Sequence, residues 1–212
     1  MIQFYALPLS SYCSKVRIVL RLKDIAFEEH PPHGGHYSNP AYKKFMPPGT
    51  IPAIDHNGFK LFDSDAIVEY LEDLYPEPAL RVSDPQVRGY HRALSQFHTT
   101  RLEPQVRRLF PLVRSPNVDL LNDVKQAFFY ELDRLLEVLD PDPLVGGSRP
   151  CLVDCVYPTT LHMAEDVFAF LGQPINFPQS IVEWLEHLKQ ENIIGDEISK
   201  NRRAIAAWLE GI

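Results

Sequence analysis

Cysteine is scarce in this chain of 212 residues, which has only Cys13, Cys151 and Cys155. An odd number of cysteines does not make a framework of disulfide bonds. No pair of histidines lies near them at the spacing of a zinc site, so we expect no metal. Cys151 and Cys155 are four residues apart on a predicted helix, where they share a face, and core packing is their expected role.

Long apolar runs and runs of positive charge are also missing. No stretch reaches the roughly 18–20 apolar residues that a membrane span needs, and residues 1–5 lack the basic start of a signal peptide. The net charge of −7, without a Lys/Arg-rich run, disfavours a nucleic acid or an anionic membrane as partner. We therefore expect a cytoplasmic protein with no membrane and no nucleic-acid partner.

The first 78 residues alternate between strand and helix patterns. Asn57-Gly58, between two short apolar runs, is a strong hairpin signal. The patterns predict strands at 2–7, 25–30, 52–54 and 59–62, and helices near 16–22, 40–45 and 67–74. The resulting order, β-α-β-α-β-β-α, predicts a thioredoxin-like α/β domain over residues 1–78.

The rest of the chain has only helical patterns. Residues 75–78, Tyr-Pro-Glu-Pro, read as a linker, and Asp84-Pro85 is an N-cap followed by proline at the first helical position. Apolar periodicity predicts helices from 85 to about 112 and over 118–139, 151–171, 178–190 and 192–209. Because the two parts differ in class, we expect a second, all-helical domain over residues 86–212.

Two motifs in the first domain indicate binding of a small anionic peptide. The Thr50-Ile51-Pro52 segment enters a predicted strand through an X-Pro bond that can be cis, which leaves the Ile51 backbone free to pair with an extended peptide. Asp63 and Ser64 precede an apolar-periodic helix, whose first N–H groups can hold an anion.

A third motif, Ser10-Ser11-Tyr12-Cys13, lies at another strand-to-helix junction. The serines can serve chemistry through a hydroxyl or can simply cap the helix. Cys13 has the position of the second cysteine in a thioredoxin CxxC motif, where the first turn of a helix would lower its pKa. Packing of a small residue between helix and sheet is the other reading, and the one we favour.

Together these motifs, their order and the helical second half resemble the cytosolic glutathione S-transferase family over essentially the whole chain. The run from Ser10 to Ile18 is similar to the serine-type pattern of the zeta class. The resemblance implies that glutathione is the co-substrate and that Ser10, or Ser11 after a one-residue shift, stabilises its thiolate. It also implies that Ile51 pairs with the cysteinyl unit, while Asp63 meets the α-ammonium and Ser64 the carboxylate of the γ-glutamyl end.

The resemblance further implies contacts beyond these anchors. His36, in a loop with His33, can border the glycine end of glutathione, or the segment can equally be a simple surface loop. A small hydrophobic electrophile is expected to contact Tyr12, His98, Arg101 and Leu102. His98 can equally be a structural histidine. A glutathione-dependent isomerase, as in the zeta class, or a glutathione-dependent dehalogenase is an alternative to glutathione transfer. The zeta class usually has cysteine where this chain has Tyr12, which counts against the isomerase.

Two other features complete the resemblance. Cys151 and Asp154 occupy the family's helix-start motif, in which Ser or Thr is followed three residues later by Asp to form a reciprocal cap. Cysteine is a poorer acceptor than serine, so we expect half of this cap to be weakened. The family also implies a homodimer, with contacts from Phe59, Phe62, Tyr90, His91 and Arg92. A glutathione-fold protein that binds without turnover is a further alternative.

Overall fold

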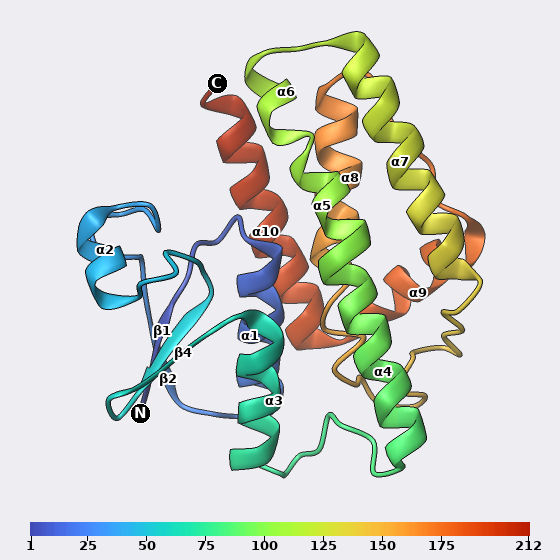
Figure 1. The fold of residues 1–212 in the computed structure, drawn as a ribbon. Coiled ribbons are helices and arrows are strands. Elements are labelled where there is room, and N and C mark those ends of the chain that lie inside the picture. Colours follow the sequence, from blue (N-terminus) through green and yellow to red (C-terminus); the bar gives the residue numbers. More distant parts are fainter. The chain divides into compact units, whose positions relative to one another are not determined.

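The computed structural model describes all residues, 1–212, and consists of two compact units, Met1–Arg81 and Val82–Ile212. The first unit has the predicted order of elements (Figure 1). Its elements are β1 (Ile2–Tyr5), α1 (Ser11–Leu22), β2 (Phe27–His30), α2 (Pro40–Phe45), β3 (Ala53–His56), β4 (Phe59–Phe62) and α3 (Ser64–Leu74). This confirms the thioredoxin-like fold class.

The sheet of the first unit has the strand order β2-β1-β3-β4, with β1 parallel to β2 and antiparallel to β3. Side chains alternate between its faces. Tyr5 and Ala53 pack against Tyr42 and Met46 at α2. The neighbouring residues, Phe4 and Ile54 among them, are fully buried toward the opposite face, which α1 and α3 cover (Figure 1).

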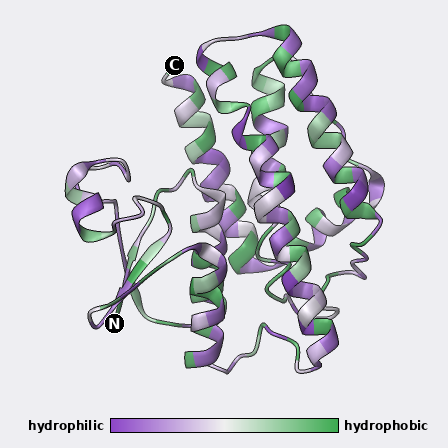
Figure 2. Cartoon of the chain, viewed as in Figure 1, coloured by the Kyte–Doolittle hydropathy of each residue, from purple (hydrophilic) through white to green (hydrophobic).

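The second unit is entirely helical. It consists of α4 (Pro85–Phe97), the π-helical turn η1 (His98–Leu102), α5 (Glu103–Arg107), α6 (Phe110–Arg114), α7 (Val118–Leu136), α8 (Pro158–Phe170), α9 (Gln179–Gln190) and α10 (Asn192–Glu210). Hydrophobic and hydrophilic residues alternate along α7 and α10 (Figure 2), as the periodicity predicted. None of the chain's helices is both long and apolar enough to cross a membrane.

The predicted single helix from 85 to about 112 was wrong, because the run is interrupted. Pro104 and Pro111 each lie near the start of a new helical segment. Proline has no N–H to donate to the carbonyl four residues earlier, so the hydrogen-bond register shifts and the π turn η1 forms before Pro104. Helix α7 also ends at Leu136 rather than 139.

The helix predicted over 151–171 begins later than expected, at Pro158. The preceding segment, 151–157, consists mainly of turns around Asp154, whose side chain accepts the N–H of Cys151 at 2.9 Å. Cys151 therefore does not cap a helix that starts beside it. Cys151 and Cys155 are both buried free thiols, as the packing hypothesis predicted.

Candidate functional site

The three predicted motifs converge at one end of the sheet. The register pairs Tyr5 with His30 on one side and with Ala53 on the other, and pairs Ala53 with Phe62. These four residues form one rung across the sheet, and the chain enters or leaves the sheet just beyond each of them. The segments with Ser10, with Ile51-Pro52, and with Asp63-Ser64 therefore all lie past the same rung, together with the loop after His30.

Ser10 is the N-cap of α1. Its hydroxyl oxygen accepts the backbone N–H of Cys13 at 3.3 Å, and its side chain is almost fully buried. Ser11 is the first residue of the helix and is 1% exposed. The capping role predicted for the serines is therefore confirmed for Ser10. A cap oxygen that accepts one N–H still carries a hydroxyl hydrogen that can be donated to a thiolate.

Cys13 is fully buried. Burial raises the pKa of its thiol to about 11, and the hydrogen bond with Ser10 only partly opposes that effect. The alternative of a reactive thiol with a lowered pKa is therefore wrong, because removal from water outweighs the helix N-terminus. Cys13 packs α1 against the sheet.

The Ile51-Pro52 bond is cis, as predicted. Pro52 is buried while Ile51 stays half-buried at the mouth of β3. The Tyr42 hydroxyl of α2 donates to the carbonyl of Thr50 at 2.9 Å, which fixes the turn from the side of α2. This tyrosine contact was not predicted, since no sequence pattern links an aromatic residue to a carbonyl eight positions away.

Asp63 is the N-cap of α3, and its Oδ1 accepts the N–H groups of Asp65 at 3.0 Å and Ala66 at 3.4 Å. Asp63 has a φ of 72°, an uncommon conformation for a residue with a side chain and one that surrounding contacts must hold. Ser64 is 4% exposed and begins the helix. Two helices, α1 and α3, thus direct their N-terminal ends beyond the same sheet rung, where their dipoles favour negative charge.

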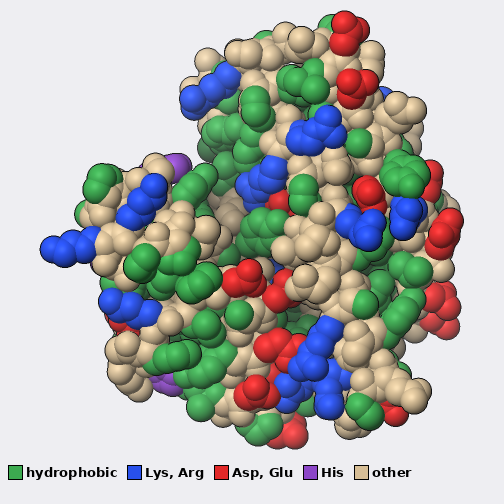
Figure 3. Space-filling view, viewed as in Figure 1, with side chains coloured by type: hydrophobic (Ala, Val, Ile, Leu, Met, Phe, Trp, Pro, Cys, Tyr) green, Lys and Arg blue, Asp and Glu red, His purple; other side chains and the backbone are tan.

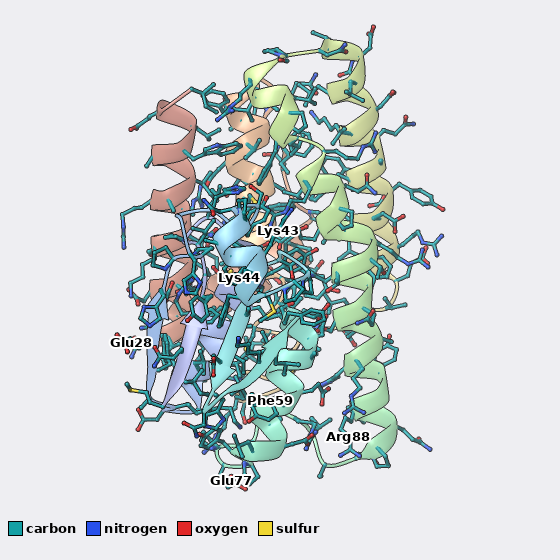
Figure 4. All side chains as sticks on the ribbon, turned by 60° about the vertical axis from the view of Figure 1, so that its left-hand side comes forward. Glu28, Lys43, Lys44, Phe59, Glu77 and Arg88 are labelled. Carbon is teal, nitrogen blue, oxygen red and sulfur yellow. The ribbon has the colours of Figure 1, made fainter.

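The loop after β2 adds His36 to this end of the sheet, and helix α2 adds positive groups. The exposed His36 bonds Ser38 through Nδ1 at 2.7 Å, within its own loop. Lys43 and Lys44 lie on α2 (Figure 4), and basic side chains, Lys or Arg, stand out over the same part of the molecule in the space-filling view (Figure 3). Lys43 also passes close to Gly49, whose φ of +64° and missing side chain allow that approach.

The residues predicted to contact an electrophile have different surroundings. Tyr12 is half-buried in the first turn of α1. His98 and Leu102 are buried in the second unit, where His98 Nε2 lies 2.8 Å from Thr160 Oγ1 and its ring packs edge-on against Tyr157. Arg101 is exposed, with its guanidinium 5.5 Å from the centre of the Phe97 ring. His98 thus has the contacts of a structural histidine.

The structure contains no group of three or more His, Cys, Asp or Glu side chains arranged to hold a metal ion.

Comparisons with known proteins agree on one family. A family model described as the N-terminal domain of glutathione S-transferase matches residues 4–79. A maleylacetoacetate isomerase of Pseudomonas aeruginosa is 41% identical over 168 residues, which cover 74% of this chain and 77% of that protein. A maleylacetoacetate isomerase of Mus musculus is 35% identical and covers 80% and 89%, respectively. A solved glutathione transferase structure from Bombyx mori has a TM-score of 0.79 at 24% identity, covering 97% of this chain and 96% of its own.

Proposed function

Because this chain is an enzyme of the glutathione S-transferase family, we propose that it binds glutathione at the end of the sheet that carries Ser10, Ile51 and Ser64. The observation that carries this proposal is the common rung His30–Tyr5–Ala53–Phe62, since it brings all three motifs to one place. The first unit is then the glutathione-binding domain.

Each anchor meets a different part of glutathione. The Ile51 backbone pairs with the extended cysteinyl unit, as an added strand does at a sheet edge. Ser64 and the first N–H groups of α3 hold the γ-glutamyl carboxylate, and Asp63 holds the α-ammonium. The N–H groups of Asp65 and Ala66 donate to Oδ1 of Asp63, which leaves Oδ2 for the ammonium. Lys43 and His36 are placed to attract the glycine carboxylate.

The Ser10 hydroxyl stabilises the thiolate. Donation of its hydrogen to sulfur, together with the N-terminus of α1, favours the charged form of the thiol. Lowering the thiol pKa by about 2 units from about 8.5 requires roughly 2.7 kcal/mol of preferential stabilisation. One charge-assisted hydrogen bond and one helix terminus can supply that amount.

Two reactions of the thiolate are candidates. In the first, sulfur attacks a small electrophile and glutathione is consumed in a stable conjugate. In the second, sulfur adds to an activated cis double bond, the resulting single bond rotates, and the thiolate leaves, so that glutathione is regenerated. The names of the Pseudomonas aeruginosa and mouse relatives support the second reaction, whereas Tyr12, at a position where the zeta class usually has cysteine, supports the first. Transfer is our primary assignment.

Recognition of the electrophile is a further part of the proposal. We propose Tyr12 as a contact in the first unit, and His98, Arg101 and Leu102, all on the π turn η1, as contacts in the second. The second unit then contributes to selectivity rather than to glutathione activation.

We also infer a homodimer in the cytoplasm, as is typical of cytosolic members of this family. Phe59 and Phe62, on the edge strand β4, are 50% and 44% exposed, and Tyr90 is 49% exposed. Large exposed aromatic side chains are typical of interface cores. Figure 4 shows Phe59 on the hairpin strand. Sedimentation should give about twice the 24.3 kDa of one chain, and a mass near 24.3 kDa would contradict the dimer.

The function is tested by assaying the purified protein with glutathione and three substrates: an aryl halide, an organic hydroperoxide and a cis-configured unsaturated dicarboxylic acid. Following both product and free thiol separates the reactions, because only isomerisation leaves the thiol concentration unchanged. Ser10→Ala should lower turnover at pH 7 about 25-fold, the loss of thiolate expected when the thiol pKa rises by about 2 units to about 8.5, while glutathione affinity stays within about fivefold. Binding without turnover of any of the three would favour the non-catalytic alternative.

A further inference from the structure

Two ion pairs join α1 to α3, the helices that provide both predicted anion-binding ends. Lys15 pairs with Asp65, and Lys23 pairs with Glu72 at 2.6 Å. The side chains of both lysines are at most 1% exposed. The two helices lie side by side (Figure 1). The pair Lys15–Asp65 joins the N-terminal parts of the two helices, and the pair Lys23–Glu72 joins their C-terminal parts. The helices are therefore parallel, with their N-terminal ends together.

The two ion pairs lie at opposite ends of this helix pair. Lys15 follows the cap Ser10 by five residues, and helical side chains lean toward the N-terminus, so its ammonium lies toward the glutathione end. Lys23 comes eight residues later, about 12 Å further along the helix axis. One pair is thus at the proposed site, and the other is a remote pair of the same kind.

The negative charge of Asp65 is unfavourable at a helix N-terminus that is proposed to bind an anion. It is the acidic residue in the first turn of α3, next to Ser64, and its N–H is held by Asp63 at 3.0 Å. A carboxylate stabilises a helix N-terminus, but there it also competes with any anionic ligand and repels it. Lys15 compensates that charge from a buried position, where screening by water is weak.

We propose that Lys15 is a positioning residue that neutralises Asp65 and thereby keeps the N-terminus of α3 receptive to the carboxylate of the γ-glutamyl unit. This inference rests on the proposed function, because it specifies how that site tolerates an acid beside its anion. Lys15 acts through Asp65 and does not itself contact glutathione.

The test is a double-mutant cycle with S-methylglutathione, an unreactive ligand, measured by isothermal titration calorimetry. Lys15→Met retains the length of the side chain but removes the ammonium that pairs with Asp65, so the Kd should rise about tenfold. Asp65→Asn removes the carboxylate beside the anion site and keeps the ammonium, so the Kd should fall about threefold. The double variant should return to within about twofold of the wild type.

The opposite changes in Kd expected for the two single variants distinguish this role from simple support of the helix pair. If the ion pair only held α1 against α3, both single variants would weaken binding, and that result would overturn the inference. If Lys15→Met fails to fold, the sign of the Asp65→Asn effect, at a partly exposed position, still decides.

Lys23→Met and Glu72→Gln are the matched controls, since they break an ion pair between the same helices at the remote end. We expect them to lower the unfolding midpoint in urea while the Kd stays within about twofold. Equal changes in Kd for the Lys15/Asp65 variants and the Lys23/Glu72 variants would overturn this inference but not the proposed function. Absence of S-methylglutathione binding by the wild-type protein would overturn the proposed function as well, so the two failures are distinguishable.

Discussion

Two aspartates, one in each unit, accept hydrogen bonds from N–H groups in different ways. Asp154 in the second unit is fully buried, and its two oxygens accept four hydrogen bonds. The donors are the backbone N–H groups of Val145, Gly146 and Cys151 and the indole of Trp184, all at 2.9–3.0 Å. Asp63 in the first unit is exposed and accepts two backbone N–H groups on one oxygen.

The difference separates a residue that stabilises the fold from one that we propose to bind a ligand. Without Asp154 all four N–H groups would lose their partner, those of Cys151 and Trp184 in buried positions, and the carboxylate has no capacity left for a ligand. Asp63 has an oxygen open to solvent, a strained φ and a neighbouring buried serine. An aspartate at a predicted helix start looks the same in the sequence in both cases. Its role differs according to how many hydrogen bonds its carboxylate oxygens already accept.

Removal of the Asp154 carboxylate should give the largest effect. Asp154→Ala leaves four donors unpaired, two of them buried, and we expect a loss of about 4 kcal/mol in the free energy of unfolding. Urea denaturation measures it. Asp154→Asn, which keeps one accepting oxygen, should lose about half as much. Asp63→Ala should lose only about 1 kcal/mol, the usual value of an N-cap. Equal losses for Asp154→Ala and Asp63→Ala would break the comparison.

The buried thiol of Cys13 makes the stability of the protein depend on pH. Its thiol pKa is raised from 9.0 to about 11 by burial, so between these values the unfolded chain releases a proton that the folded chain keeps. Stability from this group is therefore fully present below pH 9 and is lost as the pH rises toward 11. The shift corresponds to about 2–3 kcal/mol. The free energy of unfolding of Cys13→Ala, measured from pH 8 to 11, should fall less steeply than that of the wild type. Parallel slopes would show that Cys13 does not contribute.

Ser64→Ala tests the binding role of the first unit with a smaller effect. Loss of a hydroxyl that bonds the γ-glutamyl carboxylate should raise the Kd of glutathione about tenfold, or about 1.4 kcal/mol. The free energy of unfolding should change by less than about 1 kcal/mol, because Asp63 and not Ser64 caps the helix. Unchanged affinity would remove Ser64 from the site.

The fold of the first unit was largely predictable, because its signals are local. The period-2 runs, the Asn57-Gly58 turn and the caps at Ser10 and Asp63 each depend on a few neighbouring residues. The same holds for the cis bond before Pro52, a property of X-Pro steps. These local signals were sufficient to bring the candidate site to one end of the sheet.

Features that depend on distant contacts were not predictable. The ion pair of Lys15 and Asp65 joins residues 50 positions apart, and the hydrogen bond from Trp184 to Asp154 joins residues 30 apart. The true start of α8 at Pro158 follows from that buried Asp154 network rather than from periodicity. The four residues Ser10–Cys13 left a lowered pKa of Cys13 open beside the favoured packing role, because burial, unlike helix position, is not visible in so short a segment.

The central claim is that the first unit binds glutathione as a thiolate through Ser10. Ultraviolet titration of glutathione bound to the wild-type protein, Ser10→Ala and Ser11→Ala tests it most directly, since the thiolate absorbs and the thiol does not. We expect a bound-thiol pKa about 2 units below the usual value of about 8.5 in the wild type and in Ser11→Ala, and a return toward 8.5 in Ser10→Ala. A wild-type pKa that stays near 8.5 would contradict the account, and a rise only in Ser11→Ala would transfer the role to Ser11.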